Sequence, residues 1–110
     1  MPATFELRSD TDKQFYFHFL NGKDELLLMS APYPEKQEAE QAIQNVRVGS
    51  LVSEQIAAGQ TKDGETFFII KDSDGNALVK SVLFETRMLF DNALHTVKDN
   101  ACIAEIKDLT

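Results

Sequence analysis

The sequence has a single cysteine, Cys102, and no tryptophan. One thiol cannot form an internal disulfide, so the fold must depend on its apolar core, and a lone cysteine is typical of a reducing compartment. The only histidines are His18 and His95, and no Cys-x-x-Cys, His-x-x-x-His or Glu-x-x-His spacing occurs. These absences argue against a zinc site, and we expect no metal and no other cofactor.

Glycine and long apolar runs are also scarce. The five glycines are scattered, and neither a glycine-rich phosphate loop nor a G-x-G-x-x-G motif is present. Met1 leads through Pro2 and Ala3 directly into a strand-like segment, without the basic region and apolar run of a signal peptide, and no transmembrane span is present. We therefore expect a cytoplasmic protein with no membrane partner.

Basic residues are few relative to acidic ones. Eleven Lys and Arg stand against eighteen Asp and Glu, which gives a formal charge of −7 at pH 7. This charge opposes a phosphate-binding surface, so we expect no nucleic-acid partner. Tyr16, Tyr33 and Phe67 are candidates for a base-stacking platform, but they lie among acids, and core packing and cross-strand pairing explain them better.

Length and composition indicate one ordinary globular domain. The 110 residues are 43% hydrophobic and 26% charged. A chain of this length buries about two-thirds of its surface without a metal or disulfide. We predict a single domain over residues 1–110.

Hydrophobic periodicity predicts strands and two helices. Period-two alternation indicates strands near residues 5–8, 15–20, 25–30, 66–72 and 77–81. Asn21-Gly22 and Asp74-Gly75 are hairpin turn signals, and the first loop is expected to be wider. Two helical stripes follow, formed by Ala39, Ala42, Ile43 and Val46 in the first and by Phe90, Ala93, Leu94 and Val97 in the second.

The chain also resembles itself at a spacing of 51 residues. Residues 4–54 align with residues 55–105 without a gap. Seven pairs are identical, where composition alone gives roughly three: Asp12/Asp63, Phe17/Phe68, Leu27/Leu78, Ser30/Ser81, Ala42/Ala93, Val46/Val97 and Glu54/Glu105. We predict two repeats with these bounds, which complete each other in a stable monomer. The segment Leu51 to Ala58 is expected to join them in one extended passage, and Ala101 to Ile106 to form a last strand.

These residues resemble the repeat of the YegP-like family of small uncharacterised bacterial proteins. The resemblance is carried by Phe17-x-Phe19, the Asn-Gly turn, Ser30-x-x-Tyr33 and the helix around Ala42-Ile43, with a second copy over 68–97. It departs from the family at Ala42 and Ala93, where Gly is usual, and just after each aromatic. The resemblance implies an α+β fold: two tandem β-β-β-α-β repeats forming one antiparallel sheet, both helices on one face, and the last strands exchanged between repeats. It brings no established activity.

Five residues are candidates for a binding site. Ser30 with Tyr33, and Ser81 with Phe84, recur as Ser-x-x-aromatic at the strand-to-helix junction, and His18 lies on a strand. Neither serine lies in a G-x-S-x-G elbow, and no histidine recurs in both halves. Hydroxyls that satisfy backbone groups in a turn explain the serines better than nucleophiles do, and His18 is expected to be an outward strand residue.

Two functions remain open. The favoured hypothesis is a non-catalytic protein-interaction module that uses an open sheet face or edge, because no catalytic constellation is present and a single open sheet leaves edges. The alternative is a small-molecule-binding protein or minor enzyme that uses the hairpin loops with Ser30, Ser81 or His18. The residues argue against an enzyme without excluding one.

Overall fold

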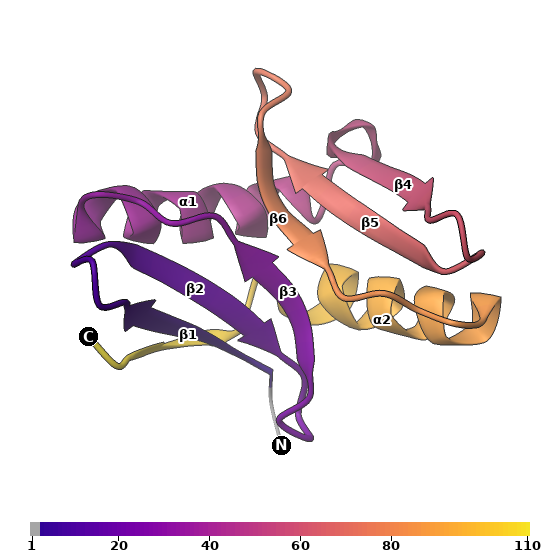
Figure 1. Ribbon diagram of the computed structural model, residues 1–110, viewed down its shortest axis with the longest axis horizontal. Coiled ribbons are helices and arrows are strands. Elements are labelled where there is room, and N and C mark those ends of the chain that lie inside the picture. Colours follow the sequence, from indigo (N-terminus) through magenta and orange to yellow (C-terminus); the bar gives the residue numbers. More distant parts are fainter. Residues whose placement is uncertain (1–2) are drawn as a thin grey trace.

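The computed structural model describes residues 3–110, which form one sheet with two helices packed against it (Figure 1). The elements in chain order are β1 (Thr4–Ser9), β2 (Phe15–Leu20), β3 (Leu26–Ser30), α1 (Lys36–Gly49), β4 (Ile56–Gln60), β5 (Thr66–Lys71), β6 (Ala77–Ser81), α2 (Arg87–Asn100) and β7 (Glu105–Asp108). A short 3-10 helix over Ser53–Gln55 precedes β4.

The sheet has seven strands in the order β4-β5-β6-β3-β2-β1-β7. The two halves meet at its centre, where β3 pairs with β6. The predicted α+β class is confirmed, but the prediction of a purely antiparallel sheet is wrong at one edge. There β7 runs parallel to β1, with Thr4 opposite Glu105 and Leu7 opposite Asp108, because the chain that leaves α2 arrives at the end of the sheet where β1 begins.

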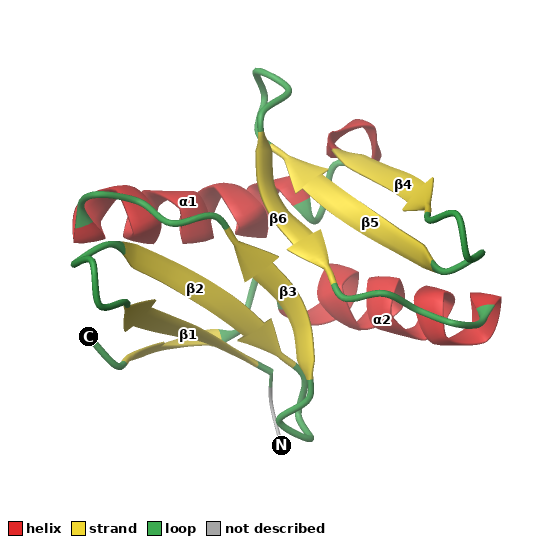
Figure 2. Ribbon diagram, in the orientation of Figure 1, coloured by secondary structure: helices red, strands yellow, loops and turns green. Residues whose placement is uncertain are grey.

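Both helices cover the same sheet face and lie behind the sheet in the view of Figure 2. Ala39, Ile43 and Val46 of α1 and Val97 of α2 are fully buried, and Phe90 of α2 is nearly so. Leu94 of the second predicted stripe is only partly buried. Their core partners on the sheet include four fully buried phenylalanines: Phe5, Phe17, Phe19 and Phe68. Helix α1 contacts β1 and β2 as well as β5 and β6 of the other half, so the halves share one core.

Corresponding elements of the two halves differ by 51 residues. The bounds of β2 and β5, of β3 and β6, and of α1 and α2 all keep this spacing. The register shifts at Phe19/Leu20 and again at Ile70/Lys71. Each shift leaves one extra residue in the facing strand, as in a β-bulge, so that the consecutive pairs Leu27-Leu28 and Leu78-Val79 are buried together. Where one repeat ends and the next begins stays a prediction.

The hairpin loops differ from the prediction. Both β2–β3 and β5–β6 are joined by five residues, 21–25 and 72–76, so the expectation of a wider first loop is wrong. The residue with positive φ is Asp24 in the first loop and Gly75 in the second. The sequence signal at Gly22 was misleading because Asp24, which also tolerates this conformation, takes the position of the glycine.

The two connectors after the helices are not extended throughout. Residues 51–55 form a turn and the 3-10 helix, and only from Ile56 does the chain become a strand. Residues 101–103 likewise form a turn, and the last strand begins at Glu105 rather than Ala101. In each case the chain must reverse its direction after the helix before it can join the sheet edge. The turn uses residues that the sequence pattern had assigned to a strand.

Candidate functional site: two grooves and an open sheet edge

The two candidate serines lie inside the strand ladder. Ser30 Oγ accepts the N–H of Phe17 at 2.9 Å and donates to the carbonyl of Ala31 at 3.0 Å. Ser81 Oγ repeats both bonds, to Phe68 N–H at 2.9 Å and to the carbonyl of Val82 at 2.9 Å. Each hydroxyl therefore satisfies the backbone where the strand leaves the sheet, as the sequence predicted.

The aromatics that follow these serines close the same junctions. Tyr33 bridges to Phe15, and Phe84 bridges to Thr66. The Phe84 ring lies parallel to the Phe68 ring with their centroids 6.2 Å apart. Partial burial raises the pKa of the Tyr33 hydroxyl, and the nearby Asp72 and Glu38 carboxylates add to the rise.

His18 lies on the sheet face away from the helices, because its neighbours Phe17 and Phe19 point into the core. It is half-buried between Glu6 of β1 and Met29 of β3. Partial burial lowers the pKa of His18, and the positive charge of Arg8 lowers it further, while Glu6 opposes the shift. Arg8 itself pairs with Glu6 at 2.8 Å.

The five candidates therefore do not converge on one site. The serines lie within the ladder, His18 is on the open face, and Tyr33 and Phe84 line two separate grooves. Within residues 3–110 no group of three or more His, Cys, Asp or Glu side chains is placed to hold a metal ion.

The first groove lies between the β2–β3 loop and α2. Its volume is about 680 Å³. Leu27, Phe84 and Leu89 are among its apolar lining residues, and Asn21 and Lys23 are among the polar ones.

The second groove occupies the corresponding place between the β5–β6 loop and α1. It holds about 400 Å³ and is lined by Tyr33 and Leu78 together with the acids Glu38 and Asp72. Each groove thus combines the hairpin of one half with the helix and aromatic residue of the other. At 51-residue spacing, Leu89 of the first groove corresponds to Glu38 of the second, so the second groove has one more acid than the first at matched positions.

The two edges of the sheet differ in charge. Three of the four residues of β7 are charged, a common protection against unwanted strand pairing. The β4 edge, with the sequence Ile-Ala-Ala-Gly-Gln, has no charge. The ring of Phe67 lies over Gly59, where a Cβ would come within 2.6 Å of it. The three central residues of this strand, Ala57, Ala58 and Gly59, are all small. Edge β4 is therefore chemically open to another strand.

The backbone groups that β4 presents can be identified from β1. The carbonyl of Leu7 faces outward and accepts the N–H of Leu109 at 2.8 Å. Ala58 faces Phe68 in the same register as Leu7 faces Phe17. Since the N–H and C=O of a strand residue point to the same side, both groups of Ala58 point away from β5.

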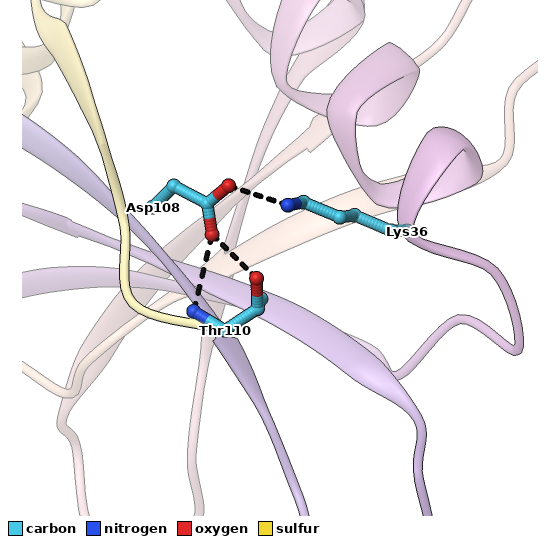
Figure 3. Close-up of polar contacts among 3 residues, drawn as sticks. All are labelled: Lys36, Asp108 and Thr110. Carbon is cyan, nitrogen blue, oxygen red and sulfur yellow. Dashed lines mark hydrogen bonds and ion pairs between the residues drawn. The ribbon is translucent and has the colours of Figure 1, made fainter.

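Edge β1, in contrast, is covered by β7, which α1 holds at both ends. Near the start of β7, the guanidinium of Arg47 donates to the carbonyl of Ala104 at 2.6 Å and lies over the Phe5 ring. At its end, Lys36 pairs with Asp108, whose other carboxylate oxygen accepts bonds from Thr110 (Figure 3). These bonds hold the pKa of Asp108 down at about 2.

Strand β7 comes from the second half of the chain and pairs with β1 of the first half. The first half makes no matching strand. Its residues 54–57, which align with 105–108, are used for the end of the 3-10 helix and the start of β4 itself. The open edge was thus detectable in the sequence, because one short connector would have to form both the last strand of the first half and the first strand of the second half.

Comparison with known proteins places this fold among bacterial proteins without an assigned activity. Residues 10–51 match a family model described as a domain of unknown function, DUF1508. A UPF0339 protein of Bordetella pertussis is 29% identical over 110 residues, covering all of this chain and 98% of the relative. A UPF0339 protein of Shewanella oneidensis is 27% identical over the full length of both chains.

Two solution NMR structures have the same fold. The structure of a UPF0339 protein from Shewanella oneidensis superposes with a TM-score of 0.95 at 27% identity, covering all of this chain and 93% of that one. The structure of the E. coli protein of unknown function yegP gives 0.92 at 29% identity, covering all of this chain and 95% of that one.

These matches define a class of small α+β proteins with one seven-stranded sheet and two helices. Within it, the chain is similar over its full length to the YegP-like proteins, whose function is unknown, as the sequence resemblance predicted. Among residues 3–110, no helix is both long and apolar enough to cross a membrane.

Proposed function

We propose that this protein is a non-catalytic interaction module that binds a strand of a partner protein along the open edge of β4. The observation that carries the proposal is the contrast between the two sheet edges: β7 is charged, whereas β4 has no charged side chain and presents the N–H and C=O of Ala58 outward. An added strand gains main-chain hydrogen bonds at such an edge without displacing any side chain.

The proposal is tested by blocking one backbone group. In Ala58→Pro the outward N–H is lost and the ring occupies the edge, whereas the bonds of β4 to β5 are kept, because an edge proline is tolerated when its N–H would face solvent. Ala58→Ser keeps the N–H and is the matched control. Affinity purification from the native host at endogenous expression, with mass spectrometry, should recover a partner with the wild type and the serine variant but not with the proline variant.

A partner retained equally by Ala58→Pro would contradict binding at this edge. To exclude loss of the fold as a cause, the proline variant must keep the dispersed amide spectrum and the β5–β6 signals of the wild type. Purification of the wild type without a stoichiometric partner would count against an interaction module altogether.

A second candidate function is small-molecule binding in the first groove. Its volume of about 680 Å³ lies within the range of ordinary ligand sites, and apolar residues such as Phe84 and Leu89 lie beside a few polar groups. A ligand found by metabolite screening should raise the melting temperature of the wild type, and Leu89→Arg should abolish the rise. The control is Glu38→Arg, the corresponding position of the second groove, which should leave it unchanged.

We also propose that the protein acts in the cytoplasm as a monomer. Cys102 is an exposed free thiol, which suits a reducing compartment. The shared core, with α1 lying on strands of both halves, supports a chain that needs no second copy. Fractionation of the host cells and light scattering at micromolar concentration test these two statements.

A further inference from the structure

The β1 edge and its bound strand β7 form a template for the empty β4 edge. In that template a parallel strand places Ile106 beside Phe5 and Asp108 beside Leu7. The last of these, Asp108, forms an ion pair with Lys36 of α1, and Arg47 holds the backbone just before the strand. The contacts thus come from one sheet edge and from two cations on the helix beside it.

The second half keeps the same parts at 51-residue spacing. Ile56 and Ala58 of β4 correspond to Phe5 and Leu7, and their registers against β5 match those of β1 against β2. On α2, Arg87 takes the position of Lys36 and Lys98 that of Arg47. What is missing from the second half is the strand itself.

The parts of the second half are also more exposed than those of the template. Leu7 is buried, whereas Ala58 is exposed. Lys36 and Arg47 are half-buried against β7, whereas Arg87 and Lys98 are exposed. Within the described residues 3–110, Arg87 pairs with one acid, Asp91, which lies one turn along its own helix, and the pair is exposed to solvent and therefore weak.

From this correspondence we infer the chemistry of the partner, an inference that rests on the function proposed above. The β4 edge takes an extended segment of another protein that runs parallel to β4 and has an apolar residue followed, two positions later, by Asp or Glu. The apolar side chain lies beside Ile56, and the carboxylate lies beside Ala58 and pairs with Arg87. A small residue at Ala58 leaves room for this carboxylate, and Lys98 holds the backbone that precedes the segment.

A second copy of this chain is a poor occupant. The segment of this chain that binds such an edge in the structure is β7. If β7 of a second copy moved to β4, it would leave its own β1 edge unpaired. The net charge of −7 also makes two copies repel each other. The inferred occupant is therefore a different protein, and the acidic residue that pairs with Arg87 lies within its bound segment.

The test uses a synthetic heptapeptide that copies Ala104–Thr110, with blocked ends, added to the isotope-labelled full chain. We expect amide shifts over Ile56–Gln60, and we expect a nitroxide on the peptide N-terminus to broaden the signal of Gln55 more than that of Gln60, because the strand is parallel. Replacing the aspartate of the peptide by lysine should weaken binding about fivefold, as expected for the loss of an exposed ion pair.

Charge reversal at Arg87, combined with charge reversal in the peptide, gives a double-mutant cycle that tests the ion pair directly. Arg87→Glu should weaken the aspartate peptide by a similar factor and restore binding of the lysine peptide, whereas Lys23→Glu, at an exposed position in the β2–β3 loop, should change neither affinity at β4.

Each other result overturns the inference. An antiparallel peptide, or one bound at β4 with no dependence on Arg87, would refute the stated chemistry and leave β4 as an interaction edge. Shifts confined to Thr4–Leu7 would mean that the peptide only displaces β7.

If the peptide at millimolar concentration shifts no β4 amide, the inference fails, while the Ala58→Pro comparison decides separately whether the edge binds a partner. Self-association through β4, seen by light scattering, would make a second copy the occupant.

Discussion

At the scale of single residues, the serines of the two Ser-x-x-aromatic motifs are structural groups with unequal importance. Both hydroxyls accept a strand N–H and donate to the next carbonyl. Ser81, however, is buried, with only 1% of its surface exposed, whereas Ser30 is half-buried. A backbone group that loses its partner costs more where water cannot replace it. The same motif should therefore respond differently to mutation in the two halves.

We predict that Ser81→Ala lowers the free energy of unfolding by about 1–3 kcal/mol, because it leaves the N–H of Phe68 buried without an acceptor. Ser30→Ala should cost less, about 1 kcal/mol, since water can reach the N–H of Phe17 more easily. Urea denaturation measures both values. Ser73→Ala, in an exposed turn, is the control and should be neutral. A Ser81 variant as stable as the control would contradict this role and reopen the serine as a functional group.

The residues with positive φ show which turn signals could be detected in the sequence. Gly64 and Gly75 have positive φ, and the turn at Gly75 was predicted from the pair Asp74-Gly75. In the first half the same positions are occupied by Lys13 and Asp24, also with positive φ. Neither is a glycine. The Asn21-Gly22 signal predicted the correct loop between β2 and β3 but not the residue in it that has positive φ.

At the scale of elements, β7 is held more by its polar ends than by its own burial. All four of its residues are exposed, including Ile106 at 38%. Beyond its backbone pairing with β1, the strand is held by Arg47 of α1 near its start and by Lys36 of α1 at its end, where Lys36 contacts Asp108 (Figure 3). A strand attached in this way should detach before the rest of the sheet unfolds.

We predict that Lys36→Met frees the end of β7 while the core stays folded. Hydrogen exchange of the Lys107 and Leu109 amides should become faster, and exchange in β5 should not change. Arg87→Met, at the matching position of α2, is the control and should leave β7 protection as it is. Equal exchange at Leu109 in the wild type and in Lys36→Met would show that the ion pair does not hold the strand.

The same pair gives a pH dependence with a definite sign. The folded chain lowers the pKa of Asp108 from its ordinary value of 3.8 to about 2. The carboxylate thus binds protons less readily in the folded state, and its contribution to holding β7 is present above pH 3.8 and lost as the pH falls toward 2. Amide shifts of Glu105–Leu109 should report this change, and Asp108→Asn should abolish it.

At the scale of the whole molecule, most of the fold could be predicted because local patterns agree with it. The helical stripes, the hairpins and the inward Phe17, Phe19 and Phe68 follow from periodicity. The parallel pairing of β7 and the bulges at Leu27 and Leu78 could not, since strand direction and register depend on contacts far apart in sequence. The five candidate residues were not brought into one site. The sequence pointed to the open β4 edge only indirectly, through a connector over residues 51–58 that is too short to form two strands.

The shared core predicts how the chain behaves when cut. Strands β3 and β6 pair across the halves, α1 lies on strands of both, and β7 covers β1. Neither half alone can bury these surfaces, so residues 1–51 and 52–110 expressed separately should each lack a dispersed amide spectrum. When co-expressed, they should form a one-to-one complex with the spectrum of the intact chain, as judged by light scattering and NMR. The cut falls beside Leu51, which is exposed, and so removes no core contact. A folded monomer of either fragment alone would show that the halves are independent, and the β4 edge would then have to be considered as part of a separate unit.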